Sequence, residues 1–153
     1  MTASMPAESF WVTPPSNAAA LPFRVVVVDD HELLRDTIRH LLLGVQDMEW
    51  VGEAADGSEA VALVDATRPD VVLMDLSMPG MDGFSATRSI VASYPSARVL
   101  VLTSSADPNH EALSLAAGAA GVLTKDGDPA TILSGIRSVM REDLPGPPRG
   151  ESG

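Results

Sequence analysis

Acidic side chains follow two of the most apolar runs of the chain, and they are the residues best suited to chemistry. Asp29 and Asp30 come directly after Arg-Val-Val-Val-Val, and Asp75 comes directly after Val-Val-Leu-Met. A carboxylate at the end of a buried strand is costly unless something compensates its charge. Two carboxylates about 4 Å apart repel by roughly 4 kcal/mol at an effective dielectric constant of about 20. If the fold brings all three together, their cleft needs a proton or a cation.

A hydroxyl and an amine occupy comparable places, because Thr103 and Lys125 each end a later apolar run. An all-oxygen cluster without cysteine favours Mg²⁺, and such an ion can bridge a phosphoryl group. The Thr103 hydroxyl and the Lys125 ammonium could then meet the remaining phosphoryl oxygens. Taken singly, an acidic pair can instead cap a helix, and a lone lysine can simply be solvated.

The three histidines, His31, His40 and His110, have no metal-ligand spacing. His31 stands beside the acidic pair and could touch a metal ion. We expect it instead to be a solvent-exposed residue in the first turn of a helix.

The elements that must position these residues are apolar strands alternating with amphipathic helices. Continuous apolar runs predict buried strands, and apolar residues at helical spacing predict helices. Asp56, Asp82, Asp107 and Asp128 are expected at helix starts, and Gly118 at a helix end. The expected strands cover residues 23–28, 49–54, 71–74, 98–103 and 120–124, and the expected helices cover about 33–43, 57–67, 83–93, 108–117 and 130–140.

Five strands that alternate with five helices imply a parallel sheet with helices on both faces and right-handed crossovers. The carboxyl ends of the strands then share one edge, which is where ligands bind in open α/β sheets. The residues expected to converge there are Asp29, Asp30, Asp75, Thr103 and Lys125.

Composition narrows the classes of protein. The chain has 153 residues, with 10 Lys and Arg against 21 Asp and Glu, so its formal net charge is -11. Such a surface disfavours direct contact with nucleic acid or anionic membranes. Cysteine is absent from the sequence, and no apolar run approaches the roughly 20 residues of a membrane span. We expect a soluble cytoplasmic protein with one domain.

Five segments together carry a family resemblance: Val-Val-Asp-Asp-His, Asp-Gly-Ser-Glu-Ala, Pro-Asp-Val-Val-Leu-Met-Asp-Leu-Ser-Met-Pro-Gly-Met-Asp-Gly, Leu-Thr-Ser and Gly-Ala-Ala-Gly-Val-Leu-Thr-Lys-Asp. From about residue 23 to 141 the chain resembles the receiver domain of bacterial two-component response regulators, and most closely receivers that precede LuxR- or NarL-type DNA-binding domains. The resemblance implies a flavodoxin-like, doubly wound α/β fold whose five-stranded parallel sheet has the order 2-1-3-4-5.

The resemblance also implies residue roles. Asp75 would be the nucleophile that takes a phosphoryl group from a phosphohistidine of a sensor kinase. Asp30 and Asp75 would bind Mg²⁺ directly, together with the backbone carbonyl of Ser77. Asp29 would contribute through bound water. The chemistry would be in-line phosphoryl transfer, which depends on positioning and charge neutralisation.

Thr103 and Lys125 would hold the phosphorylated state, and the movement of Thr103 would change the surface formed by the last two helices and the last strand. Two positions depart from the common pattern. Val122 stands where many relatives have Tyr or Phe, so the familiar aromatic switch is unavailable. Asp126 follows Lys125 where many receivers have proline, which excludes a cis-proline lock there. Ser77 and Ser105 occupy positions that tune dephosphorylation in relatives.

Three alternatives compete with the phosphorylated switch. An atypical receiver would keep the fold and signal by binding alone. A haloacid-dehalogenase-type phosphatase would also form an aspartyl phosphate, but that family has a second Asp where this chain has Ser77. A dinucleotide enzyme would need a glycine-rich turn after the first strand, where this chain has Asp29-Asp30-His31. In the preferred interpretation the only chemistry is self-phosphorylation and autodephosphorylation, so the protein is not a conventional enzyme.

The expected organisation has three parts. Residues 1–22 are a disordered leader, 23–141 are the receiver domain, and 142–153 are a flexible tail or a truncated linker. The implied partners are a sensor histidine kinase and a second copy of the chain in a homodimer. The output, which is expected in transcriptional control, acts through a partner protein or through a DNA-binding domain missing from this chain.

Overall fold

Strands and helices alternate along the part of the chain that the computed structural model describes, which is residues 22–76, 82–104, 107–125 and 128–141. Outside these ranges lie the expected tail, all of the expected leader except residue 22, and the residues Ser77, Ser105 and Asp126. In chain order the elements are β1 (Phe23–Val28), α2 (Glu32–Leu43), β2 (Met48–Ala54), α3 (Gly57–Thr67), β3 (Val71–Asp75), α4 (Gly83–Ser93), β4 (Arg98–Thr103), α5 (Pro108–Ala116), β5 (Gly121–Thr124) and α6 (Ala130–Arg141).

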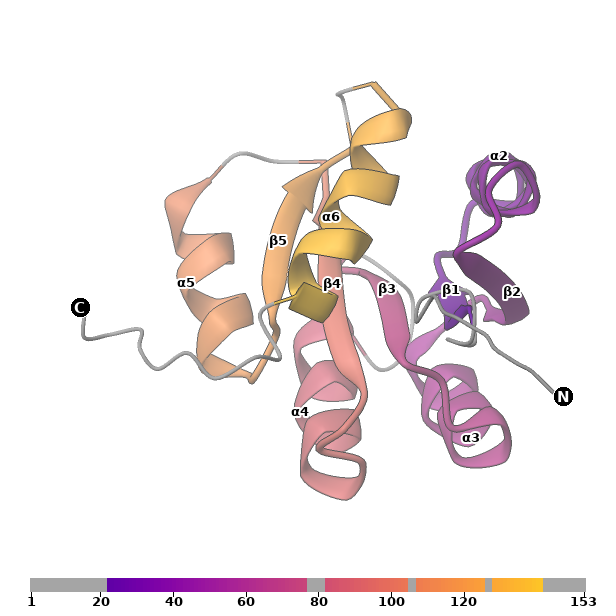
Figure 1. The fold of residues 1–153 in the computed structure, drawn as a ribbon. Helices are drawn as coiled ribbons and strands as arrows, with labels where there is room; N and C mark the ends of the chain where they lie inside the picture. Colours follow the sequence, from indigo (N-terminus) through magenta and orange to yellow (C-terminus); the bar gives the residue numbers. More distant parts are fainter. Residues whose placement is uncertain (1–21, 77–81, 105–106, 126–127, 142–153) are drawn as a thin grey trace, which may run out of the picture.

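The strands form one parallel sheet in the order β2-β1-β3-β4-β5 (Figure 1). Val28 of β1 lies opposite Met74 of β3, so these two strands end side by side. Thr103 of β4 likewise lies opposite Thr124 of β5. The predicted fold class and strand order are therefore confirmed, and the carboxyl ends of the strands share one edge.

Alternate residues of the central strands pack into two separate hydrophobic layers. Val26 and Val28 face the layer beneath α3 and α4, whereas Val25 and Val27 face the layer beneath α2 and α6. Figure 1 shows these helix pairs on opposite sides of the sheet, with α5 beside β5. The strands are apolar throughout because both of their faces are covered.

Aspartates start the helices as predicted. The side chain of Asp56 accepts a hydrogen bond from the backbone N–H of Glu59 at 2.9 Å, and Asp82 accepts one from Ser85 at 2.8 Å. The side chains of Asp107 and Asp128 accept backbone hydrogen bonds from Asn109 and Ala130. Each bond satisfies a backbone donor that the first turn of a helix leaves unpaired.

Several local features differ from the sequence-based expectation. Strand β2 begins one residue earlier, at Met48, and β5 begins one residue later, at Gly121. Leu33 follows the apolar spacing of α2 but is 79% exposed, whereas Ile38 and Leu42 of the same helix are buried. Arg68 ends α3 in the left-handed region with φ 48°, where glycine is the usual residue.

Within the described ranges, none of the helices combines the length and the apolar character that crossing a membrane requires.

Candidate functional site

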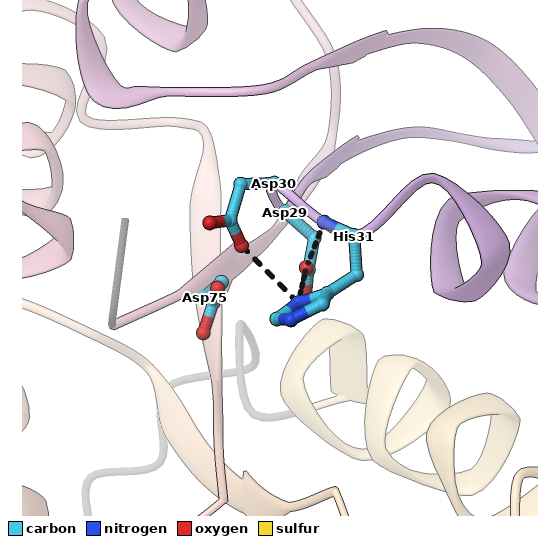
Figure 2. Close-up of side chains that lie close together, drawn as sticks. All are labelled: Asp29, Asp30, His31 and Asp75. Atoms are coloured by element: carbon cyan, nitrogen blue, oxygen red, sulfur yellow. Dashed lines mark hydrogen bonds and ion pairs between the residues drawn. The ribbon is translucent and has the colours of Figure 1, made fainter. Parts of the chain in front are cut away.

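The acidic residues converge at the carboxyl edge of the sheet. Asp29 follows β1 directly, and its backbone N–H continues the pairing with β2 by donating to the carbonyl of Ala54 at 3.0 Å. Asp75 is the last residue of the neighbouring strand β3. One ligand atom from each of Asp29, Asp30, His31 and Asp75 lies within 4.8 Å of the others (Figure 2). The structure thus brings together three carboxylates from two separate strand ends.

Burial divides these carboxylates into two kinds. Asp29 and Asp75 are 0% and 2% exposed, whereas the side chain of Asp30 is 32% exposed. Two buried carboxylates cannot both stay ionised at low cost without a counter-charge. The more open Asp30 lies on the side from which a solvated ion can arrive.

Lys125 supplies the counter-charge. Its Nζ lies 2.7 Å from Oδ2 of Asp29 and 2.9 Å from Oδ1 of Asp75. Burial by itself lowers the pKa of Lys125. Hydrogen bonds to both aspartates and their negative charges more than offset that effect, so the pKa lies above its ordinary value. The side chain is therefore an ammonium ion at neutral pH.

The end of β4 places Thr103 at the same edge. Asp75 lies opposite Leu102 in the register of β3 and β4, and Thr103 is the next residue along β4. The carbonyl of Thr103 accepts the backbone N–H of Lys125 at 2.7 Å. Thr103 is 5% exposed. The backbone hydrogen bond joins the end of β4 to the backbone that carries Lys125.

His31 is the N-cap residue of α2 rather than a residue of its first turn. Its side chain makes no capping hydrogen bond to the helix. Instead Nδ1 lies 2.9 Å from Oδ1 of Asp29 and 3.1 Å from Oδ1 of Asp30. Figure 2 shows the ring turned towards these carboxylates. The side chain is 68% exposed, as expected, yet it is part of the cluster.

Sequence reasoning missed the contribution of Arg35. Its Nη1 donates to the carbonyl of Asp29 at 2.6 Å, and its Nε donates to Oε2 of Glu53 at 3.2 Å. The guanidinium thereby ties the first acidic loop to β2. A signal was available, since Arg35 lies one helical turn after His31 and residues four apart share a helix face.

Gly83 keeps the start of α4 close to the strand end that carries Asp75. A Cβ atom at this position would lie 2.3 Å from the carbonyl oxygen of Asp75 and 2.7 Å from Cα of Leu76. Both are backbone atoms that cannot rotate away. Glycine is therefore required here by a close backbone approach.

The donor set fits a hard divalent cation. Three carboxylate groups facing one ammonium leave two negative charges, which one divalent ion would neutralise. Carboxylate oxygens with room for water are the ligands that Mg²⁺ prefers. Ser77, the remaining expected ligand, lies outside the described residues.

The chain resembles known signalling proteins. The family model described as "Response regulator receiver domain" matches residues 25–137. The uncharacterized transcriptional regulatory protein YhcZ of Bacillus subtilis is 41% identical over 110 residues, which are 72% of this chain and 51% of YhcZ. The chain spans about half the length of the curated relatives it matches.

Solved structures of response regulators have a similar fold. A two-component response regulator of the LuxR family from Aurantimonas sp. SI85-9A1 has a TM-score of 0.75 and 37% identity, covering 78% of this chain and 86% of that one. A chain of the CheX–CheY–BeF₃–Mg²⁺ complex from Borrelia burgdorferi has a TM-score of 0.75 and 27% identity, covering 82% of this chain and 94% of that one. The acidic cluster described above is consistent with a magnesium site of this kind.

Proposed function

The chain belongs to the response regulator receiver domain family, and on this premise we propose that, in the cytoplasm, Asp75 accepts a phosphoryl group from a phosphohistidine of a sensor histidine kinase. A carboxylate oxygen of Asp75 attacks phosphorus, the new O–P bond forms as the P–N bond breaks, and the histidine imidazole of the kinase leaves. The observation that supports this role is the position of Asp75 at the end of β3, next to two further carboxylates and 2.9 Å from the ammonium of Lys125.

Asp30 and Asp75, with the backbone carbonyl of Ser77, are the residues we propose to hold Mg²⁺. Asp29 acts through water. When bound, the ion neutralises charge on the transferring phosphoryl group and aligns its oxygens. Asp30 is the most exposed of the three carboxylates, with 32% of its side chain exposed, which supports direct contact with a solvated ion.

Lys125 and Thr103 are proposed to hold the product. A phosphoryl group adds about two negative charges and three acceptor oxygens, so the Lys125 ammonium and the Thr103 hydroxyl can pair with it. Because the carbonyl of Thr103 accepts the N–H of Lys125 at 2.7 Å, both residues would move together. The movement would reach α5, β5 and α6, the elements that follow these residues. Strand β5 has Val122 and no aromatic residue, so a change of aromatic rotamer in this strand cannot be part of the movement.

The direct test is a mass measurement. The protein is incubated with Mg²⁺ and acetyl phosphate, and the intact mass is expected to rise by one phosphoryl group. Asp75→Asn should abolish the increase. Asp36→Asn, at a carboxylate on α2 that is 45% exposed, should retain it. A wild-type protein that gains no mass would favour a receiver that signals by binding alone. Sustained turnover of phosphate esters would instead favour the phosphatase alternative.

The output we propose is a change in protein contacts that controls transcription. Relatives that are named transcriptional regulatory proteins, such as YhcZ of Bacillus subtilis, support this assignment. A homodimer or a separate partner protein could carry the signal. Light scattering before and after phosphorylation, with Asp75→Asn as control, tests the dimer. An unchanged mass in wild type after complete phosphorylation would exclude phosphorylation-dependent dimerisation.

A further inference from the structure

We propose that His31 is a metal-selecting residue, which adds a nitrogen ligand to the acidic cluster and raises the affinity of the site for Ni²⁺ and Co²⁺ relative to Mg²⁺. This inference rests on the proposed function, because it assumes that Asp30 and Asp75 hold the ion. It adds a residue outside the carboxylate set assigned above. A receiver of this kind would therefore respond to the identity of the available divalent ion.

The position of the ring carries the proposal. A residue at a helix N-cap commonly turns its side chain back to the first backbone N–H groups. His31 does not, since its side chain makes no capping bond to α2. Its Nδ1 instead lies 2.9 Å and 3.1 Å from carboxylate oxygens of Asp29 and Asp30. The ring nitrogen is thus directed into the carboxylate cluster (Figure 2).

The backbone holds this orientation. The N–H of His31 donates to Oδ1 of Asp29 at 2.8 Å, the same oxygen that Nδ1 approaches at 2.9 Å. Arg35 fixes the carbonyl of Asp29 at 2.6 Å, one helical turn away. The imidazole therefore stands on a short loop whose two ends are both anchored. With 68% of the side chain exposed, an ion and its waters can reach the ring from solvent.

The chemistry of the ligand determines which ions benefit. Mg²⁺ is a hard ion that prefers oxygen ligands and keeps much of its water. Imidazole suits Ni²⁺ and Zn²⁺, and affinity for nitrogen-containing sites rises along the series from Mn²⁺ to Cu²⁺. In the structure Nδ1 donates its proton to the carboxylates, so an ion that binds this nitrogen must displace that proton. An imidazole at this place should raise affinity for nickel and cobalt and leave affinity for magnesium almost unchanged.

The test compares metal affinities by calorimetry. Wild type and His31→Asn are titrated with Mg²⁺ and, separately, with Ni²⁺. We expect Ni²⁺ affinity to fall about 10- to 100-fold in His31→Asn, the range typical when a group supporting a metal site is lost. Mg²⁺ affinity should change less than about twofold. Asparagine can serve as an N-cap, so α2 keeps its start. His40→Asn is the matched control, since the Nδ1 of His40 lies 2.8 Å from the carbonyl of Asp36 within the same helix.

A spectroscopic measurement tests whether the imidazole of His31 binds the metal, without relying on affinities. Proton NMR of the Co²⁺-loaded protein should show a strongly shifted exchangeable imidazole resonance that is present in His40→Asn and absent in His31→Asn. Equal Ni²⁺ affinity in wild type and His31→Asn, or a shifted resonance that survives the substitution, would overturn the inference. Those outcomes leave Asp75 phosphorylation untouched. Failure of the proposed function would appear differently, as no Mg²⁺ binding and no mass gain in wild type.

Discussion

The ammonium of Lys125 lies 2.9 Å from Oδ1 of Asp75, although the two residues are fifty positions apart and the side chains are only 17% and 2% exposed. The pair joins the end of β5 to the end of β3 across β4. In the proposed function the same ammonium would pair with a phosphoryl group formed on Asp75. Lys125 would therefore stabilise both forms of the protein, by pairing with Asp75 in the unmodified form and with the phosphoryl group in the phosphorylated form.

Replacing Lys125 should destabilise the fold unless a cation takes its place. Lys125→Met leaves buried Asp29 and Asp75 without their ammonium, and breaking a buried pair in this way costs about 3 to 5 kcal/mol. We expect the lower end of that range, because the ammonium keeps some exposure. Urea unfolding measures the change. Saturating Mg²⁺ should recover part of the loss, whereas Arg88→Gln, on the exposed side of α4, should behave like wild type.

The same ammonium should give the protein a stability limit at alkaline pH. The pKa of Lys125 is raised in the folded state relative to the unfolded chain. A raised pKa means that the stabilising contribution is complete below the unfolded pKa of about 10.4 and is lost as pH rises through the folded value. The stability difference between wild type and Lys125→Met should thus be constant near neutrality and shrink above about pH 10.4. A difference that grows in this range would contradict the assignment.

Gly83→Ala should damage the site although it replaces no charged residue. The added Cβ would lie 2.3 Å from the carbonyl oxygen of Asp75, so either α4 or the end of β3 must shift. Overpacking of this kind costs about 1 to 3 kcal/mol. We expect slower phosphoryl uptake from acetyl phosphate, measured by intact mass. Gly44→Ala is the control, because its Cβ would lie 3.5 Å from the nearest heavy atom, an ordinary contact. Equal rates in the two variants would show that the close approach is unimportant.

Much of this arrangement follows from sequence because it depends on repeated local patterns. Apolar runs that end in Asp29, Asp75 and Thr103 predicted both the strands and the edge on which they meet. Aspartate before a helix predicted the caps, since the hydrogen bond it makes is local. The strand order required the family resemblance, because alternation of strands and helices permits more than one order.

Other features depended on three-dimensional packing that no local pattern encodes. The direction of the His31 ring is set by two carboxylates that contact the same ring nitrogen, and the contact of Arg35 with Asp29 joins α2 to the loop after β1. Leu33 has the spacing of a buried face but is 79% exposed and is not part of the buried layer that includes Ile38 and Leu42. Arg68 adopts a left-handed conformation while Arg24 donates to its carbonyl at 3.1 Å.

Arg35 should be a positioning residue for the metal site. Arg35→Met removes the 2.6 Å hydrogen bond to the carbonyl of Asp29 and the 3.2 Å bond to Glu53. Loss of a group that orients metal ligands typically lowers affinity about 10- to 100-fold, and we expect this for Mg²⁺ in calorimetry. Arg39→Met is the control, since Arg39 lies on the same helix but stacks over Trp50 with its guanidinium 5.4 Å from the ring centroid. Unchanged Mg²⁺ affinity in Arg35→Met would remove Arg35 from the site.

The ion pair between Asp47 and Arg137 should give a weak stability limit at acid pH. Nε and Nη2 of Arg137 donate to the two carboxylate oxygens of Asp47 at 2.7 Å and 3.0 Å, joining α6 to the segment before β2. The hydrogen bonds from Arg137 lower the pKa of Asp47 despite partial burial. A lowered pKa means that the contribution is present above the unfolded value of about 3.9 and is lost as pH falls through the folded one.

The expected size is small, because the side chains of Asp47 and Arg137 are 45% and 37% exposed and solvent screens the pair. Exposed pairs are worth about 0.2 to 1 kcal/mol, so Arg137→Met should lose no more than this at pH 7. Unfolding curves of wild type and Arg137→Met should then converge as pH is lowered below about 3.9, the range in which Asp47 becomes protonated. High salt should also bring them together at pH 7. A gap that persists under both conditions would mean that Arg137 stabilises α6 through packing of its aliphatic chain and not through charge.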